Sequence, residues 1–313
     1  MRYKIFPYEP TAIFAADTHV RSTIPKCRTD NYLLAQEKKL LFLFGAGMFY
    51  NVPIIIAGDF SDTAEMSNWL VTQLFIMLRQ ENAPYVGMVP GQHDLPNHRL
   101  SQWKRSGAAS LHFGLPNFEI YTTKFGRFPS PKFSCCFFPY DTTLENWMPP
   151  FNDHHHICIA HKMVIENKKL WPGQVVRDAK WYLKKHKFYN VIVTGDNHLP
   201  FVVKYKRRLL VNPGSMMRMK ADQMDHRPRA YLWFSYSNHV EPLYFPIEKG
   251  VVSDKHILDE TERKYRVKAY VARLKKRQDF GLSFKENMKT FIRENKLFRR
   301  SRSLRNKIWS HVK

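Results

Sequence analysis

Pairs of acidic and histidine side chains follow short apolar runs at several points of the sequence. The first pair, Asp17 and His19, comes directly after an apolar run at residues 13–16. Such runs are typical of buried strands, and ligands bind at the carboxyl ends of strands in an α/β sheet. Carboxylates and imidazoles gathered at one sheet edge predict a centre for two metal ions. Four further runs end in the same way, in Gly58-Asp59, Gly91-Gln92-His93-Asp94, His161 and Gly195-Asp196-Asn197-His198.

The predicted pair of metal ions needs a carboxylate that bridges them, and Asp59 is the candidate. Two such ions can clamp the attacking and leaving oxygens in phosphoryl transfer. Ligands that mix imidazole with carboxylate or amide groups suit Mn, Fe, Zn or Co better than Ca. The expected ligands are Asp17, His19, Asp59 and His198 for the first ion, and Asp59, Gln92, His161 and Asp196 for the second.

His93 follows a predicted ligand without having to bind metal itself. Its imidazole can serve as the general acid that protonates the leaving oxygen. Asp94, the next residue, is expected to orient the His93 ring by a hydrogen bond. Each cluster alone has a plainer explanation, namely a turn or a structural histidine. The order, strand context and residue types that the five clusters share favour the catalytic interpretation.

The apolar runs and amphipathic segments alternate, which predicts an α/β fold with a largely parallel sheet. Residues 118–121 and 133–138 are interpreted as antiparallel strands around a turn rich in glycine and proline. Two sheets packed face to face between helices, a four-layer α-β-β-α sandwich, are expected over residues 1–250. Residues 251–313 form a basic helical region in this interpretation. Its helices are predicted at residues 255–277, 284–295 and 299–312.

The charge balance indicates the kind of partner. The 313 residues include 50 Lys and Arg against 27 Asp and Glu, a net charge of +23. Such a surface suits a polyanion, with nucleic acid ahead of an anionic membrane surface. An uncharged apolar run long enough to span a membrane is missing, so no membrane partner is expected. The four cysteines lack C-x-x-C spacing and suit a reducing compartment.

The five motifs resemble those of the calcineurin-like metallophosphoesterase superfamily, over roughly residues 12–246. Within it, the segment Val211-Asn212-Pro213-Gly214-Ser215 and the chain length resemble SbcD-type DNA repair nucleases, and phage recombination nuclease subunits in particular. The resemblance implies a nuclease with two metal ions, most often Mn, with Mg, Fe or Zn as alternatives. It also implies an SbcC-like coiled-coil ABC ATPase subunit as partner. The expected location is the cytoplasm of a bacterium or a phage-infected host, and a homodimer is left open.

Two motifs depart from the family pattern, and both changes fall on the second metal site. Gln92 stands where the family has Asn, and Asp196 stands where it has His. An anionic ligand in place of a neutral one makes that site harder, which favours Mn or Mg over Zn. Loss of the second metal is the competing interpretation.

Basic residues near the motifs are expected to hold DNA phosphates without sequence specificity. The basic tail, with 19 Lys and Arg against 6 Asp and Glu from Lys255 to Lys313, has three interpretations. It binds DNA, it offers an apolar helix face to the partner's coiled coil, or it packs on its own domain. The predicted DNA-binding residues are Arg21, Arg99, Lys206, Arg207, Arg208 and Arg218 in the first region, and Arg299, Arg300 and Arg302 in the tail.

The sequence favours a metal-dependent DNA phosphodiesterase, acting as an exonuclease or endonuclease in recombination or repair. One alternative is a phosphatase or phosphodiesterase for another substrate, which the charge of +23 disfavours. The other is a DNA-binding scaffold whose altered second site is inactive. Activity on small phosphoesters would support the first alternative. DNA affinity without cleavage would support the second.

Overall fold

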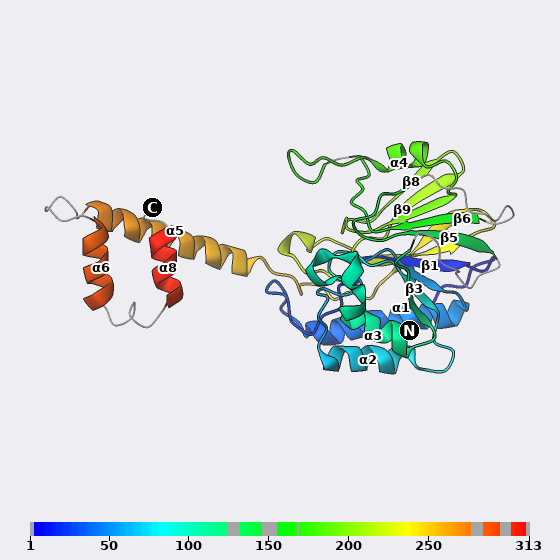
Figure 1. The fold of residues 1–313 in the computed structure, drawn as a ribbon, viewed down its shortest axis with the longest axis horizontal. Helices are drawn as coiled ribbons and strands as arrows, with labels where there is room; N and C mark the ends of the chain where they lie inside the picture. Colours follow the sequence, from blue (N-terminus) through cyan, green and yellow to red (C-terminus); the bar gives the residue numbers. More distant parts are fainter. Residues whose placement is uncertain are drawn as a thin grey trace. The chain divides into compact units, whose positions relative to one another are not determined.

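The computed structural model describes residues 3–123, 132–145, 155–167, 169–276, 284–294 and 302–310. The chain divides into two compact units, Met1–Val252 and Ser253–Lys313 (Figure 1). Among the described helices, none is long and apolar enough to cross a bilayer.

Two β-sheets form the centre of the first unit. The six-stranded sheet has the order β11-β10-β1-β2-β3-β4, in which β1 to β4 are parallel and β10 and β11 are antiparallel additions. Its strands are β1 (Ala12–Ala15), β2 (Ile54–Ile56), β3 (Val86–Met88), β4 (Phe118–Ile120), β10 (Arg229–Phe234) and β11 (His239–Tyr244).

The five-stranded sheet has the order β5-β6-β7-β9-β8. Neighbouring strands in it are parallel, except β8 and β9, which are antiparallel. Strands β8 and β9 form an antiparallel hairpin. Its strands are β5 (Phe133–Phe138), β6 (His155–Ala160), β7 (Val191–Thr194), β8 (Phe201–Tyr205) and β9 (Arg208–Asn212).

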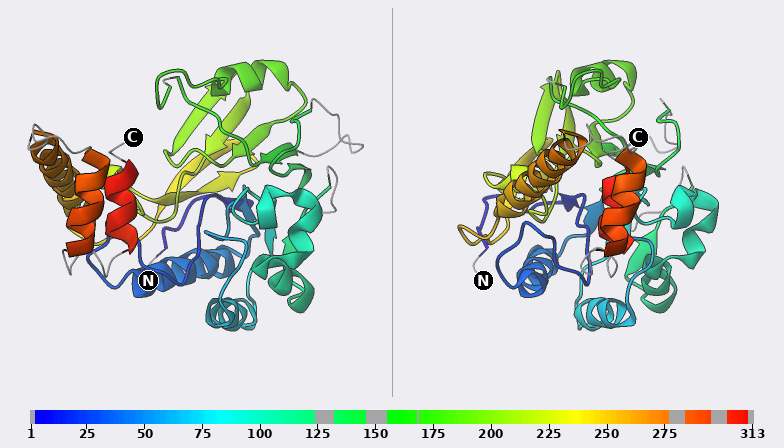
Figure 2. Two further views of the ribbon diagram at one scale, coloured as in Figure 1. Left: turned by 60° about the vertical axis from the view of Figure 1, so that its left-hand side comes forward. Right: turned by 90° about the vertical axis from the view of Figure 1, so that its left-hand side faces the viewer.

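Helices cover the outer faces of both sheets (Figures 1 and 2). Side chains of α1, α2 and α3 pack with Ile13 and Ile54 of the six-stranded sheet, and those of α4 pack with Ile192 of the other. The alternate residues Phe14 and Ile55 enter a separate core between the sheets. The predicted four-layer sandwich is therefore confirmed. The helices are α1 (Tyr32–Tyr50), α2 (Asn68–Leu78), α3 (Gly107–Gly114) and α4 (Ala179–Lys185).

The predicted hairpin of residues 118–121 and 133–138 is wrong. Strand β4 lies parallel to β3 in one sheet, and β5 lies parallel to β6 in the other. Both segments are apolar enough to be strands, but their partners are strands far apart in the sequence. Residues 124–131, which carry the expected turn, lie outside the described residues.

The second unit contains three described helices, α5 (Lys255–Lys276), α6 (Phe284–Glu294) and α8 (Arg302–Ser310), close to the predicted ranges. The ring centroids of Tyr270 in α5 and Phe291 in α6 lie 5.8 Å apart. Val271 and Met288 are buried. Part of the apolar face predicted for α6 is therefore used inside its own unit.

Candidate metal centre

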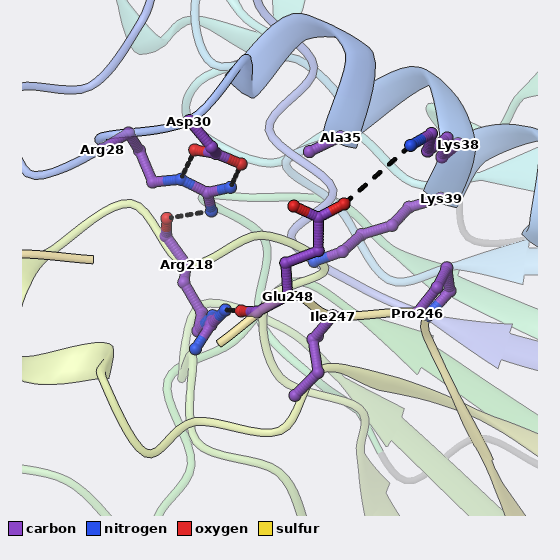
Figure 3. A pocket seen from close by; sticks show the side chains of 9 residues that line it. All are labelled: Arg28, Asp30, Ala35, Lys38, Lys39, Arg218, Pro246, Ile247 and Glu248. Atoms are coloured by element: carbon purple, nitrogen blue, oxygen red, sulfur yellow. Dashed lines mark hydrogen bonds and ion pairs between the residues drawn. The ribbon is translucent and has the colours of Figure 1, made fainter. Parts of the chain in front are cut away.

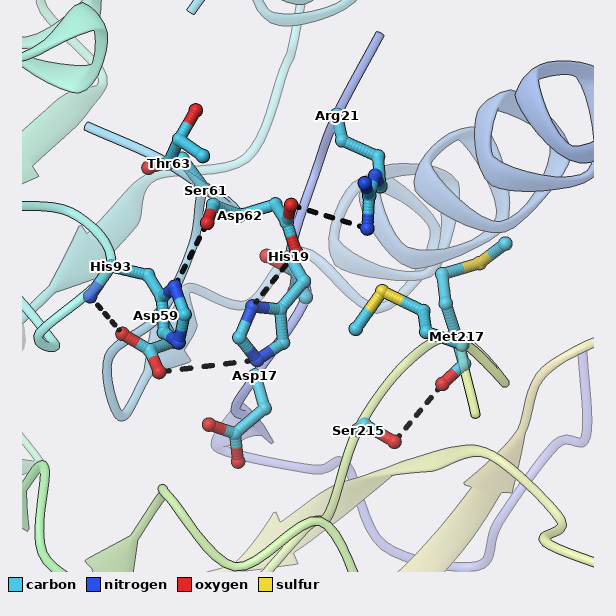
Figure 4. A network of polar contacts seen from close by, with 12 residues as sticks. Asp17, His19, Arg21, Asp59, Ser61, Asp62, Thr63, His93, Ser215 and Met217 are labelled. Carbon is cyan, nitrogen blue, oxygen red and sulfur yellow. Dashed lines mark hydrogen bonds and ion pairs between the residues drawn. The ribbon is translucent and has the colours of Figure 1, made fainter. Parts of the chain in front are cut away.

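The carboxyl ends of five parallel strands deliver the candidate side chains to one place. Strand β1 leads to Asp17 and His19, β2 leads to Asp59, and β3 leads to the segment around His93. Figure 4 shows the carboxylates of Asp17 and Asp59 close to the His19 ring. Strands β6 and β7 of the second sheet lead to the other candidates, His161, Asp196 and His198.

Glycines let the motif segments approach one another closely. A Cβ on Gly58 would lie 2.1 Å from Nδ1 of His161, and one on Gly91 would lie 2.1 Å from Oδ1 of Asp59. A Cβ on Gly195 would lie 2.1 Å from the Ala57 carbonyl oxygen. Any side chain at these positions would push the loops apart. Glycine precedes Asp59, Gln92 and Asp196 because the neighbouring motif fills the space of its side chain.

Four candidate ligands have the left-handed backbone conformation that ordinary residues avoid. Their φ angles are 48° at Asp17, 44° at His19, 49° at Asp59 and 74° at Asp196. Each such residue costs on the order of 1 kcal/mol or more, and strain of this kind clusters at functional sites. The strand ends turn sharply here, which brings successive side chains toward the centre.

In the described part of the chain, two buried carboxylate oxygens have no hydrogen-bond partner. They are Oδ2 of Asp17 and Oδ2 of Asp59, and both residues are fully buried. The other oxygens are satisfied, since the Asp196 N–H donates to Asp17 Oδ1 at 3.0 Å and the His93 N–H donates to Asp59 Oδ1 at 2.9 Å. A buried, unpaired carboxylate oxygen is costly without a cation. The two atoms therefore fit positions that face metal ions.

His19 and His198 meet Asp17 on one side of the centre. Their Nε2 atoms lie 3.1 Å apart, so a proton or a metal ion must separate the two lone pairs. Burial lowers the pKa of His19 to about 3. Burial, followed by the charge of Lys220, lowers the pKa of His198 to about 4. Both rings are therefore neutral near pH 7, the form that binds metal.

His161, Gln92 and Asp196 occupy the other side. The His161 Nδ1–H donates to the Ala57 carbonyl at 2.8 Å, which leaves Nε2 directed at Gln92 Oε1, also at 2.8 Å. The Gln92 Nε2 group donates to Asp196 Oδ1 at 3.0 Å. Burial lowers the pKa of His161, but the charge of Asp59 and further carboxylates outweigh it and raise the pKa to about 10. The carboxylates around His161 therefore stabilise a positive charge at this position.

The donor set fits two divalent ions. Among the residues that the structure describes, three triads each offer ligand atoms within 4.8 Å of one another, and Asp17 and Asp59 each belong to two of them. Asp17 therefore joins Asp59 as a candidate bridge. The predicted ligands all gather here, although their roles as ligands stay predictions. The triads are Asp17, His19 and His198; Asp17, Asp59 and His161; and His19, Asp59 and His93.

Asp94 does not orient the His93 ring as predicted. The His93 Nδ1–H donates to the carbonyl of Asp62 at 2.9 Å. The buried Asp94 carboxylate instead accepts from the N–H groups of Phe60, Ser61 and Gly91 and from the Ser61 hydroxyl. It therefore ties the loop after β2 to the loop after β3. Adjacency in sequence misled the prediction because the two side chains leave the turn in different directions.

The residues predicted to bind DNA lie in different parts of the structure, and only some of them are near the centre. Arg21 lies beside the centre, but its Nη1 pairs with Asp62 Oδ2 at 3.2 Å (Figure 4). Arg99 is exposed between two 3₁₀ segments, Pro96–His98 and Leu100–Arg105. Arg299 and Arg300 lie outside the described residues. The backbone of Arg302 belongs to α8, in the second unit.

The predicted placement of Lys206, Arg207 and Arg208 near the centre is wrong. Lys206 and Arg207 form the β8–β9 turn, and Arg208 is the first residue of β9. Strand β9 runs parallel to β7, whose carboxyl end leads to Asp196. The turn therefore lies at the opposite end of the strands, roughly 13 Å away for a five-residue strand. Arg208 is also held by the His186 carbonyl, to which its Nη1 donates at 3.0 Å.

Arg218 is also unsuited to contact DNA. Only 5% of it is exposed, and its Nη1 and Nη2 donate to the carbonyls of Met224 and Glu248. The sequence showed a basic residue near a motif but not the carbonyl groups that surround it.

The sequence motifs do not reveal a cavity with an acidic wall beside His93. A cavity of about 550 Å³ opens beside Gln92 and His93. Asp62 and Glu65 contribute to its lining, together with Asn97 and His98. The signal in the sequence was a second aspartate three residues after Asp59.

Neither a comparison with protein-family models nor one with curated proteins gives a match. Solved structures similar to this chain include an archaeal phosphodiesterase, with 14% identity over 75% of this chain and 99% of that one and a TM-score of 0.41. A phosphopantetheinyl hydrolase from Mycobacterium tuberculosis has 13% identity over 75% and 96%, with a TM-score of 0.42. A dimetal phosphatase from Danio rerio has 10% identity over 76% and 99%, with a TM-score of 0.45.

Proposed function

We propose that this chain is a metallophosphoesterase that hydrolyses phosphodiester bonds with two divalent metal ions. The observation that carries the proposal is the pair of buried oxygens without a hydrogen bond, Asp17 Oδ2 and Asp59 Oδ2, beside the neutral imidazoles of His19 and His198. Against the effect of burial, the charge of Asp59, whose Oδ2 lies 3.3 Å from His161 Nε2, raises the pKa of His161 to about 10. Carboxylates in this state need cations. The motif resemblance to calcineurin-like metallophosphoesterases supports the same chemistry.

The residues around the centre divide the work. When bound, the two ions would supply Lewis-acid stabilisation of the phosphoryl oxygens. His93 has its Nδ1–H fixed by the Asp62 carbonyl, so its Nε2 can carry a proton to the leaving oxygen. Asp94 fixes the two loops that carry Asp59 and His93. The Ala57 carbonyl fixes the His161 ring with Nε2 toward the centre.

The finer proposal is a DNA nuclease subunit that prefers Mn and acts with an SbcC-like ATPase in a bacterial or phage-infected cytoplasm. The net charge of +23 and the basic second unit support a polyanionic substrate. The departure at Asp196 supports a hard metal, because a carboxylate oxygen stands where the family has a softer imidazole, whereas Gln92 keeps the amide oxygen of the family's Asn.

A smaller phosphoester is the second candidate substrate. The cavity beside His93 is lined by Asp62 and Glu65, which would repel a polyanion. Arg21 is already paired with Asp62, and Arg218 is buried. These observations favour a substrate that presents one phosphate at the centre.

Cleavage assays separate the candidates. End-labelled single- and double-stranded DNA, bis-p-nitrophenyl phosphate and p-nitrophenyl phosphate would each be incubated with Mn²⁺, Mg²⁺ or EDTA. The nuclease proposal expects metal-dependent cleavage of DNA that exceeds turnover of the small esters. Turnover of small esters alone would support the second candidate. No hydrolysis with any metal, with DNA affinity that survives EDTA, would support the inactive scaffold and overturn the enzyme proposal.

A further inference from the structure

A second polar cavity, of about 160 Å³, lies in the first unit and has no part in the metal centre (Figure 3). Three parts of the chain enclose it: the segment before α1 together with the first turns of α1, the loop around residue 218, and the segment after β11. Its charged lining consists of Arg28, Asp30, Lys38, Lys39, Arg218 and Glu248.

The cavity holds more positive than negative charge. Asp30 is used by Arg28, whose Nε and Nη2 both donate to its carboxylate. Lys38, Lys39 and Arg218 are left with one carboxylate, that of Glu248. Glu248 Oε1 lies 3.9 Å from Lys38 Nζ, and its side chain is 71% exposed, so the pair is weak.

Two of these cations are buried with unused donors. Lys39 is 3% exposed, and its Nζ donates to the Met216 carbonyl at 2.8 Å. An ammonium group has three donors. Arg218 is 5% exposed, and its Nε has no hydrogen-bond partner. Burial, followed by the charges of Arg28 and Arg218, lowers the pKa of Lys39 to about 7, and the opposing charge of Asp30 does not compensate for it.

We propose that this cavity binds a phosphate group, with Lys38, Lys39 and Arg218 as its cationic partners. Cavities for drug-sized ligands measure roughly 300–1,000 Å³, so this one suits a single oxyanion rather than a whole nucleotide. The group is either free inorganic phosphate or the terminal phosphate of a nucleic acid strand. Both present the same oxygens to the lysines and the arginine.

Glu248 is a competitor for the phosphate group. Its carboxylate is the internal anion nearest Lys38, and the ligand would have to approach the same ammonium group. Removing this charge should therefore strengthen binding, whereas removing Lys38 should weaken it. Both side chains are substantially exposed, so neither substitution disturbs the core.

The test is calorimetric titration of the full chain with inorganic phosphate in EDTA, so that no metal ion attracts the ligand. Glu248→Gln should raise the affinity severalfold, and Lys38→Ala should lower it severalfold. Lys39→Met should abolish binding, with circular dichroism as the check of folding. Lys204→Ala, at an exposed lysine on β8, is the matched control and should bind as the parent does.

A competition experiment between inorganic phosphate and short oligonucleotides identifies the source of the phosphate group. A trinucleotide with a 5′ or 3′ phosphate that displaces inorganic phosphate, while the unphosphorylated form does not, would identify a strand end. Binding of inorganic phosphate alone would identify the free ion. No phosphate binding at millimolar concentration would overturn the proposal. Binding that neither Glu248→Gln nor Lys38→Ala changes would overturn it as well.

Discussion

Nε2 of His161 lies 2.8 Å from Oε1 of Gln92, although both atoms are acceptors when the imidazole is neutral. The Nδ1–H of the same ring donates to the Ala57 carbonyl, and Asp59 Oδ2 lies 3.3 Å from Nε2. Three electron-rich atoms in such proximity need a cation. A proton on Nε2 can fill that role, and so can a metal ion, for which all three atoms are suitable ligands.

Gln92→Leu should remove one ion and leave the other. The substitution keeps the size of the side chain approximately but removes the amide group, including the oxygen that faces His161. Asp17, His19 and His198 are untouched. Titration with Mn²⁺, followed by electron paramagnetic resonance, should give two bound ions for the parent chain and one for the variant.

Gln92→Asn is the control, because it keeps an amide oxygen one methylene shorter and should retain measurable second-site binding. Two ions bound to Gln92→Leu with the parental affinity would mean that Gln92 is not a ligand. One ion bound to the parent chain would support loss of the second metal.

Asp17→Asn should stabilise the metal-free protein and abolish its response to metal. Oδ2 of Asp17 is buried without a partner, and burial, followed by the charges of Asp59 and Asp196, raises the pKa of this carboxyl. An amide keeps the acceptor for the Asp196 N–H and removes the charge. We expect a gain of about 1–3 kcal/mol in the unfolding free energy in EDTA.

Thermal unfolding with and without Mn²⁺ checks both parts of this prediction. The parent chain should melt higher with the ion, because a ligand that binds only the folded state stabilises it. Asp17→Asn should lose that increase. A variant less stable than the parent in EDTA would argue that the carboxylate serves the fold rather than the metal.

His93→Ala should slow hydrolysis without removing the metals. General acids contribute roughly 10²- to 10⁴-fold to such reactions, and the fall in kcat should lie in this range. The Mn²⁺-dependent rise in melting temperature should persist. If that rise disappears instead, His93 is a ligand, as its place in a triad with His19 and Asp59 also permits.

Much of the centre could be predicted because short-range patterns determine it. An apolar run followed by Asp or His identifies a strand end without knowledge of the strand's partners, so the candidate ligands could be named. The partners of β4 and β5 could not be predicted. Strand β4 pairs with β3 and β5 pairs with β6, and the turn between β4 and β5 does not determine either pairing. The positive charges of Arg218 and Arg208 are likewise visible in the sequence. The carbonyl groups that accept their hydrogen bonds are brought to them only by the fold, so they could not be predicted.

Asp94 illustrates the same limit at a shorter range. Its position next to His93 suggested a contact with the ring, but the backbone N–H groups of Phe60 and Ser61, more than thirty residues earlier, hold its carboxylate. The role of Gly91 also depends on the fold, since Asp59 occupies the position of its missing side chain.

Gly91→Ala should disrupt the centre. The added Cβ would lie 2.1 Å from Oδ1 and 2.4 Å from the backbone nitrogen of Asp59, and a backbone atom cannot move away cheaply. We expect a loss of several kcal/mol in the unfolding free energy, in the range of overpacked cores, and loss of metal binding. Urea denaturation and Mn²⁺ titration measure the two effects.

Gly250→Ala is the matched control for this test. Gly250 has a positive φ of 70° but open space around the position of a Cβ. It should cost only about 1 kcal/mol, the penalty of the left-handed conformation, and leave metal binding intact. Equal effects at the two positions would contradict the close approach of Gly91 to Asp59.

Lys39→Met should change the pH dependence of stability. Burial, followed by Arg28 and Arg218, lowers the pKa of Lys39 from 10.5 to about 7 in the folded chain. Between these values the unfolded chain binds more protons, so the unfolding free energy rises with pH, by up to about 1.4 kcal/mol per unit. Below pH 7 both states are protonated and the contribution of Lys39 is constant.

The variant lacks this contribution. Urea denaturation at pH 6, 7, 8 and 9 should therefore show the parent chain gaining stability relative to Lys39→Met only above pH 7. Lys204→Met, which replaces an exposed lysine, should keep a constant difference from the parent at every pH. A constant difference for Lys39→Met would mean that the buried ammonium group already has a counter-charge, which would also remove the main reason for a phosphate group beside it.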